Sequence, residues 1–229
     1  MNDQIVIKDY DKPLECNIKR LERSLVDISP VVGVQHRLSE IFISLFLANF
    51  ADLPPSSDRS GHPLNRSNWT HHTYFAMRST AKTLEVICTF ETMGRLDAIV
   101  ESVENYPGIV LLAEWETNSS SIFGAHNELE KLWTGVNEHE CADAFLFTYC
   151  PVDTLYDFTR RVVEYWQSRK TTRQNSPSLF LTIVAYRRVG KSDHFVFIRT
   201  LEIGPSVVSL WHDLGFVAAE EYLECIEGL

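Results

Sequence analysis

Two apolar stretches decide the predicted fold: R-L-D-A-I-V-E-S (residues 95–102) and I-V-L-L-A-E-W-E (residues 109–116). The second begins with five apolar residues in a row, which predicts a strand buried on both faces. Before the first stretch, Met93-Gly94 forms a turn after a segment rich in β-branched and aromatic residues, 83–90. This pattern predicts a hairpin, so we expect three consecutive strands here.

Acidic residues lie at corresponding ends of these predicted strands. Glu114 and Glu116 follow the buried run, and side-chain alternation places them on one face and Trp115 on the other. If the preceding strand pairs alongside, Asp97 brings a third carboxylate to that face. Three half-buried carboxylates repel one another unless a hard divalent cation is present, and the expected cation is magnesium.

The rest of the chain alternates between helical and extended patterns, which predicts one α/β domain over residues 1–229. A loop rich in Pro, Ser, Asp and Gly at 54–68 could form a mobile flap. The predicted helices are 17–26, 34–50, 70–82, 122–135, 154–169 and 215–228. The further predicted strands are 142–150, 178–187 and 194–202, the last two antiparallel around Gly190.

Composition describes a protein with a substantial apolar core and an acidic balance. The chain has 229 residues, is 45% hydrophobic and carries a formal charge of -10. No stretch predicts a membrane span or a secretory signal, so we expect no membrane association and a cytoplasmic location. Five cysteines without close pairing predict reduced thiols and no zinc site.

The negative charge argues against nucleic acid as a partner but does not exclude it. Local basic clusters occur at 160–161, 169–173 and 187–191, each of which, taken alone, is more typical of a solvated face than of a phosphate contact. E-x-E alone is likewise more typical of a strand end that reaches water. The upstream Asp97 and the helix that follows make a functional site the better interpretation.

The order helix, strand, strand with Asp97, strand with E-x-E, helix, strand resembles the core of the PD-(D/E)XK nucleases. Within that superfamily the chain resembles BamHI-type type II restriction endonucleases, which carry glutamate where most relatives have lysine. The resemblance rests on the following segments: Leu96-Asp97, E-W-E-T (114–117), S-S-S-I-F-G-A-H-N-E-L-E-K-L (119–132) and A-D-A-F-L-F-T-Y-C-P (142–151). It implies a restriction-endonuclease-like core with a mixed central sheet flanked by helices.

The resemblance implies a Mg²⁺-dependent endonuclease that hydrolyses double-stranded DNA. Phosphodiester hydrolysis requires an activated water and positive charge on the phosphorane, which two metals held by Asp97, Glu114 and the Trp115 carbonyl could supply. Glu116 would be a ligand or the general base. Either Glu40 or Glu85 could complete the site.

Base recognition in such enzymes is expected near the start of the helix after E-x-E and on the helix after the next strand. The matching candidates here are Asn118, Ser121, Asn127, Arg160 and Arg161. Arginine and asparagine can form paired hydrogen bonds to guanine and adenine edges. Two residues more than in the relatives separate Glu116 from Ala125-His126, so the recognised sequence is left open.

Cutting both strands of a palindrome implies a homodimer, and a cognate DNA methyltransferase would be a further partner. Trp133, Tyr165 and Trp166 could form the dimer interface, although core packing is at least as consistent with their helical spacing. Lys131 is expected to be structural or to face phosphate. Two alternatives remain: a repair or structure-directed nuclease without base specificity, and a non-catalytic nuclease-like binding or assembly protein.

Overall fold

The computed structural model describes residues 34–50, 66–92, 96–102, 108–116, 119, 121–123, 127–139, 142–171, 176–189 and 192–215. The predicted helix at 17–26 lies outside these residues, as do most of the predicted loop at 54–68 and all but the first residue of the predicted helix at 215–228. None of the helices within the described residues is both long enough and apolar enough to cross a bilayer.

Seven strands form one sheet whose spatial order, β1-β2-β3-β4-β5-β6-β7, follows the sequence. The strands are β1 (Ile87–Thr92), β2 (Leu96–Ser102), β3 (Gly108–Glu116), β4 (Asp143–Pro151), β5 (Leu179–Val189), β6 (Ser192–Ile203) and β7 (Val208–Gly215). Pairing is parallel for β3–β4 and β4–β5 and antiparallel for the other neighbours. The sheet is therefore mixed, with a parallel centre between two antiparallel edges.

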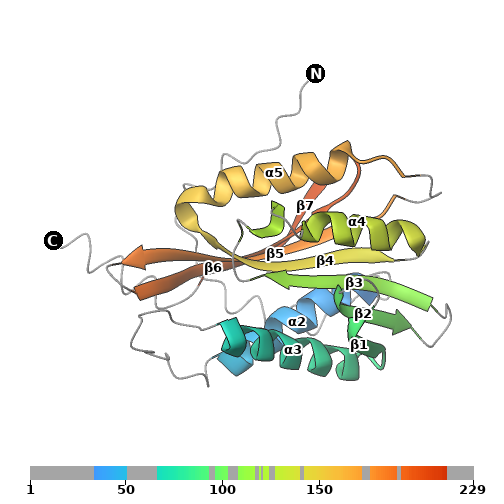
Figure 1. The fold of residues 1–229 in the computed structure, drawn as a ribbon. Helices are drawn as coiled ribbons and strands as arrows, with labels where there is room; N and C mark the ends of the chain where they lie inside the picture. Colours follow the sequence, from blue (N-terminus) through green and yellow to red (C-terminus); the bar gives the residue numbers. More distant parts are fainter. Residues whose placement is uncertain are drawn as a thin grey trace.

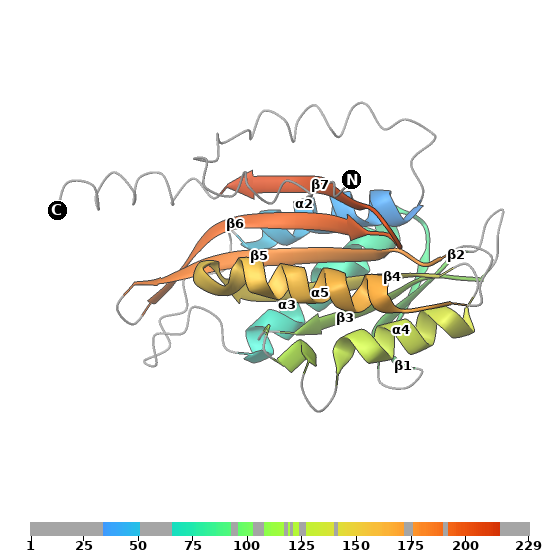
Figure 2. The same cartoon turned by 90° about the horizontal axis from the view of Figure 1, so that it is seen from above.

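Helices cover both faces of the sheet (Figures 1 and 2). One layer contains α2 (Val34–Phe50) and α3 (Arg66–Thr83), which precede the sheet in the sequence. The other contains α4 (Glu128–Glu138) and α5 (Leu155–Ser168), which make the crossovers between the parallel strands. Successive crossovers of the same hand place their helices on the same face, which explains why α4 and α5 lie together.

Each face of the sheet has its own apolar core. Phe42 and Phe46 of α2 pack edge-on against Phe147 of β4, with ring centroids 5.0 and 4.9 Å apart. On the opposite face, Trp133 of α4 packs against Trp166 of α5 with centroids 5.1 Å apart. Side-chain alternation along β3 and β4 supplies both cores, since both strands are buried on both faces.

The predicted α/β class and mixed sheet flanked by helices are confirmed, but three elements differ from the prediction. The first strand begins at Ile87 and not at 83, because α3 continues to Thr83. The helix after E-x-E begins at Glu128 and not at 122, because a short 3-10 helix, η2 (Ser121–Phe123), comes first and Asn127 caps α4. β7 was not predicted at all. A turn closed by the Gly204 N–H and the Val207 carbonyl (2.9 Å) reverses the chain, and β7 then pairs with β6.

Candidate functional site

Asp97 and Glu114 meet across the β2–β3 pair. The antiparallel register joins Ala98 to Ala113, so the next position places Asp97 opposite Glu114 with both side chains on one face. An Asp97 carboxylate oxygen accepts a hydrogen bond from the Trp115 backbone N–H at 2.7 Å. Glu114 is only 2% exposed. Two acids from neighbouring strands are thus held together where water has little access.

Helix α4 adds two charged side chains to this pair. The Lys131 ammonium lies 2.9 Å from Glu114 Oε1 and forms a second ion pair with Glu128, one helical turn earlier. Glu128 is buried in the first turn of α4, where the helix dipole favours a carboxylate. We define Asp97, Glu114, Glu128 and Lys131 as the acidic cluster. It draws on β2, β3 and α4.

Gly135 explains how α4 comes close enough to β3 to build the acidic cluster. A Cβ at this position would lie 2.5 Å from Leu112 Cδ1, which is closer than real Cβ atoms approach a neighbour. Leu112 is buried and lies two residues before Glu114 on the same face of β3. The glycine therefore allows the helix to rest directly on the strand that carries the site.

Burial and mutual repulsion disturb the charges of the acidic cluster. Burial raises the pKa of Asp97, although the hydrogen bonds from Trp115 and Glu114 act in the opposite direction. Burial and the neighbouring Asp97 charge raise the pKa of Glu114 well above its ordinary value, opposed by Lys131. Burial lowers the pKa of Lys131, but its bonds to Glu128 and Glu114 outweigh this and raise it. Glu114 therefore favours its protonated form, which can donate to Asp97.

The donor set of the acidic cluster fits a hard divalent cation. Carboxylate oxygens are the ligands that Mg²⁺ prefers, and the Lys131 ammonium stands in a position where a cation is stabilised. Over the part of the chain that the structure describes, no three His, Cys, Asp or Glu side chains already stand in metal-binding geometry. In the described structure, Glu114 and Glu128 hold the Lys131 ammonium.

Glu116, the third predicted acid, lies at the end of β3 on the same face as Glu114. Its backbone carbonyl accepts a hydrogen bond from the Thr148 hydroxyl at 2.8 Å, which ties the strand end to β4. Its side chain is half-buried. The structure therefore places Glu116 beyond the Asp97–Glu114 pair, at the carboxyl-terminal end of β3.

The described structure does not place Glu40 or Glu85 beside the Asp97–Glu114 pair. Glu40 belongs to α2, which covers the opposite face of the sheet. Glu85 lies in the turn before β1, whose first residue, Ile87, pairs with Glu101 at the far end of β2 from Asp97. The further glutamate that the described contacts bring to the pair is Glu128, through Lys131. Its spacing of three residues from Lys131 was visible in the sequence, but the packing of α4 on β3 was not.

The predicted DNA-contact residues are not gathered in one place by contacts that the structure describes. Asn118 lies outside the described residues, and so does the side chain of Ser121 in η2. Asn127 has a left-handed backbone (φ 36°), and its side-chain oxygen accepts a hydrogen bond from the Glu130 N–H at 3.2 Å. Its role in the described structure is therefore that of an N-cap of α4.

The two predicted arginines of α5 differ in their surroundings. Arg160 is exposed and pairs along its own helix with Glu164 (2.8 Å) and Asp157 (3.6 Å). The Arg161 guanidinium lies over the Phe123 ring, 4.1 Å from its centroid. Arg161 therefore joins α5 to η2, just after the E-x-E strand, whereas the described contacts of Arg160 remain within α5.

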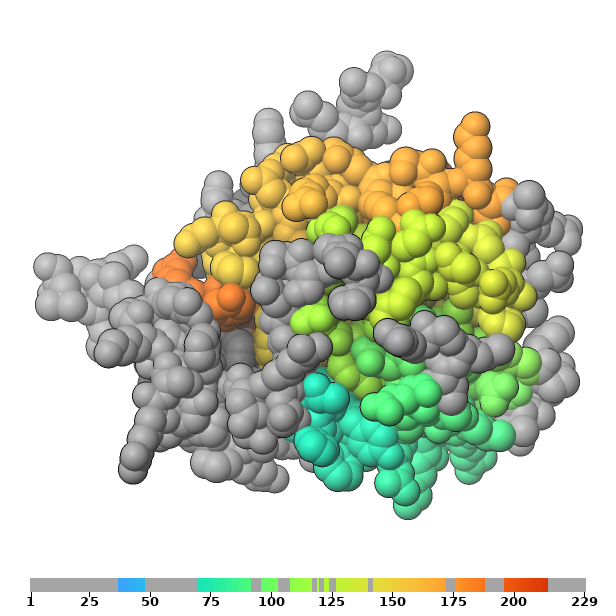
Figure 3. Space-filling view, in the orientation of Figure 1, coloured from blue at the N-terminus to red at the C-terminus, as the bar shows by residue number. Residues whose placement is uncertain are grey.

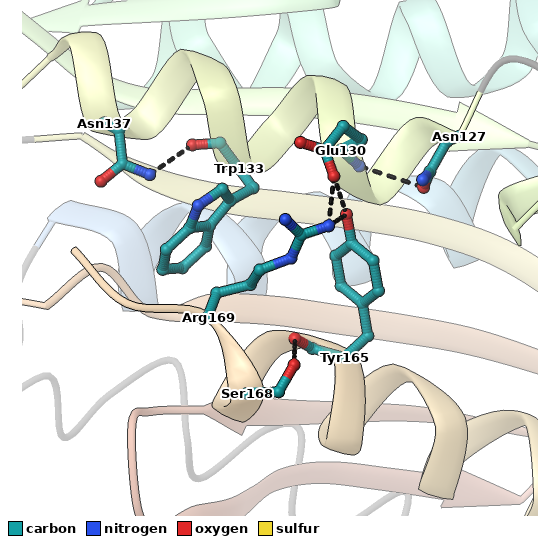
Figure 4. Close-up of polar contacts among 7 residues, drawn as sticks. All are labelled: Asn127, Glu130, Trp133, Asn137, Tyr165, Ser168 and Arg169. Carbon is teal, nitrogen blue, oxygen red and sulfur yellow. Dashed lines mark hydrogen bonds and ion pairs between the residues drawn. The ribbon is translucent and has the colours of Figure 1, made fainter.

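The aromatic residues considered for a dimer interface hold α4 to α5. Trp166 is 2% exposed and its indole N–H donates to the Pro177 carbonyl at 3.1 Å, so core packing is confirmed for this residue and for its partner Trp133. The Tyr165 hydroxyl donates to Glu130 at 2.5 Å, and Arg169 also pairs with Glu130 (Figure 4). The two helices form adjoining surfaces on one side of the molecule (Figure 3).

Comparison of the chain with protein-family models, with curated proteins and with solved structures gives no match.

Proposed function

We propose that this protein is a metal-dependent DNA endonuclease of the PD-(D/E)XK type, and specifically a type II restriction enzyme. The observation that carries the proposal is the meeting of Asp97 and Glu114 on one buried face, with Asp97 anchored by the Trp115 N–H. Burying two acids together is unfavourable for folding. Such pairs with disturbed pKa values are typical of functional sites.

The order of the elements supports the same function. Helix α3 is followed by the antiparallel strands β1, β2 and β3, then by α4 and by β4, which is parallel to β3. Asp97 lies on the second of these strands and E-x-E ends the third. This is the order on which the resemblance to the PD-(D/E)XK nucleases rests.

Asp97, Glu114 and the Trp115 carbonyl would hold the magnesium. The N–H and C=O of one strand residue point to the same side, so the Trp115 carbonyl faces β2, as its N–H does. When bound, Mg²⁺ supplies positive charge to a phosphodiester oxygen and makes a coordinated water more acidic. We propose that the site binds two such ions.

Glu116 is the proposed proton acceptor. It extends past the buried pair into a half-exposed position, where a carboxylate retains access to water. The bond from Thr148 to its backbone fixes the end of β3 and therefore the direction in which Glu116 projects. Asp97 and Glu114 would bind and orient, and Glu116 would take the proton from the attacking water.

Double-stranded DNA is the proposed substrate, with Arg161 the best-supported contact. The guanidinium of Arg161 lies over Phe123. Phe123 belongs to η2, the first element after the E-x-E strand in the sequence. Arg160 would have to exchange its exposed acidic partners for phosphate, and such surface pairs are weak. A homodimer and a cognate methyltransferase remain part of the proposal.

The test is incubation of the purified protein with plasmid DNA and Mg²⁺, followed by gel electrophoresis. A restriction enzyme produces discrete fragments, and we expect Asp97→Asn and Glu114→Gln to abolish them. Glu138→Gln is the matched control, since Glu138 is an exposed glutamate at the end of α4. A smear, or cutting confined to branched DNA, would favour the structure-directed nuclease. No cutting under any metal, or full cutting by Glu114→Gln, would overturn the proposal.

A further inference from the structure

We infer that Lys131 is a resident counter-ion that a divalent cation displaces, and that its departure frees Glu128 to become a third carboxylate ligand. The inference rests on the proposed function for the presence of the cation. It adds two residues that the sequence did not assign to the site, and a step, exchange of an internal ammonium for the metal, that precedes any chemistry.

The contacts of Lys131 support the first half of this inference. Its ammonium pairs with Glu114 of β3 and with Glu128 of α4. Asp97 of β2 is close enough for an electrostatic interaction with the same ammonium. Carboxyl groups from three elements share this space, and Lys131 is the ammonium that the described contacts place among them. Lys131 therefore holds the site together when no metal is bound.

Exposure decides which partner can leave. The Lys131 side chain is 26% exposed at the end of a flexible four-carbon stem, whereas Glu114 and Glu128 are buried with relative exposures of 2% and 8%. A divalent cation on Glu114 would repel an ammonium 2.9 Å from the same carboxylate. The lysine can turn outward to water, and the buried glutamates cannot follow it.

Departure of Lys131 changes the ligands available. Glu128 loses its ion-pair partner while it is still buried beside Glu114, and a buried carboxylate requires a new positive charge. The cation supplies that charge. Glu128 thus adds a carboxylate to those of Asp97 and Glu114, and the start of α4 becomes a wall of the metal site.

The first experiment measures Mg²⁺ binding without DNA, by isothermal titration calorimetry on the full chain. Lys131→Met removes the competing charge, so we expect Mg²⁺ to bind roughly tenfold more tightly than to the parent. Glu128→Gln should weaken binding. Lys170→Met is the matched control, because Lys170 is exposed just beyond α5, and its affinity should equal that of the parent.

The second experiment follows Lys131 itself in the unmodified chain. Acetylation of lysines by an amine-reactive reagent, read by mass spectrometry, should become faster at Lys131 when Mg²⁺ is added, with Lys170 as an internal reference. This measurement requires no variant to fold. It also separates departure of Lys131 from a change in the stability of Lys131→Met, which thermal unfolding would report.

The outcomes distinguish this inference from the proposed function. Unchanged or weaker Mg²⁺ binding by a folded Lys131→Met, or acetylation of Lys131 that does not respond to Mg²⁺, overturns the exchange even if the parent cuts DNA. Tighter binding and faster acetylation in a protein that cuts no DNA support the exchange and leave the nuclease proposal wrong. Absence of Mg²⁺ binding in both parent and variant overturns both.

Discussion

The two faces of the sheet treat ionisable groups away from water in opposite ways. On the face covered by α2 and α3, they include two histidines that burial keeps neutral by lowering their pKa values, His72 and His212. On the face covered by α4 and α5, the buried ionisable side chains are Glu114, Glu128 and Arg199. Arg199 forms a bidentate pair with Asp213 at 2.5 and 3.1 Å. Over the described residues, the buried ionisable groups of the first face include neutral imidazoles, whereas those of the second are carboxyl and guanidinium groups held in ion pairs.

This difference separates stability from function. A buried ion pair adds little to stability compared with apolar residues of the same volume, because both ions lose their hydration. Among the described residues, the α2–α3 face buries no Asp, Glu, Lys or Arg side chain. We therefore assign the acidic cluster to the proposed function rather than to folding, and this assignment has consequences for mutants.

The largest effect is expected on the neutral face. Phe147→Ala removes a buried ring that packs against both Phe42 and Phe46, and such changes cost about 3–5 kcal/mol of unfolding free energy. Urea denaturation followed by circular dichroism measures this loss. Phe75→Ala is the control, since Phe75 of α3 is 55% exposed and should change stability by only about 0.5 kcal/mol. Similar losses for both would contradict the assigned core.

The second effect is a dependence of stability on pH from the neutral face. Burial lowers the pKa of His212 from its ordinary 6.5 to about 4. The unfolded chain therefore takes up this proton first, so stability is complete above about pH 6.5 and falls as the pH decreases towards 4. The expected loss from His212 is on the order of 2 kcal/mol.

Asp97 and Glu114 oppose this trend, because their raised pKa values favour the folded state at low pH. The informative quantity is therefore the difference between the parent and His212→Gln, measured by urea denaturation at pH 7 and pH 4.5. If the unfolding free energy changed equally with pH in the two proteins, the pKa of His212 would not be lowered by burial. His212 would then no longer count as a neutral buried group of this face.

The third prediction concerns a buried substitution that should not reduce stability. Glu114→Leu replaces a buried acid by an apolar side chain, relieves the repulsion with Asp97 and leaves Lys131 paired with Glu128. We expect stability to stay equal or to rise by about 1 kcal/mol, while cleavage is lost. Denaturation and the plasmid assay measure the two quantities. A loss of stability as large as that of Phe147→Ala would make Glu114 a folding residue and remove the contrast between the faces.

The sequence allowed prediction of those parts that depend on local pattern. The run before Glu114 is apolar at every position, which identified β3, and alternation then placed Glu114 and Glu116 on one face. The turn predicted at 93–94 and the acid at position 97 identified the neighbouring strand, β2. The helix 34–50 was predicted with the bounds that α2 has.

Other parts depend on tertiary contacts that no local pattern reveals. Apolar Ile122 continued the helical periodicity of α4 backwards, but Asn127 adopts a left-handed backbone and starts the helix later. The predicted helix already contained Glu128 and Lys131, but the packing of α4 on β3 that brings them beside Glu114 is a tertiary contact. β7 was missed because Gly204-Pro205 resembled an end, whereas the chain turns there and pairs with β6.

The smallest expected effect comes from a contact between α4 and α5 outside the acidic cluster. It tests whether Mg²⁺ binding depends on the acidic cluster alone. Tyr165→Phe removes a hydroxyl that bonds Glu130 and Arg169 between α4 and α5 (Figure 4). The ring is half-buried and Glu130 keeps Arg169, so we expect a loss of only about 1 kcal/mol in urea denaturation. Mg²⁺ affinity should not change, although Glu130 neighbours Lys131 in sequence. If Tyr165→Phe altered Mg²⁺ binding as much as Glu128→Gln, the α4–α5 contacts would belong to the metal site, and function would extend along the whole charged face.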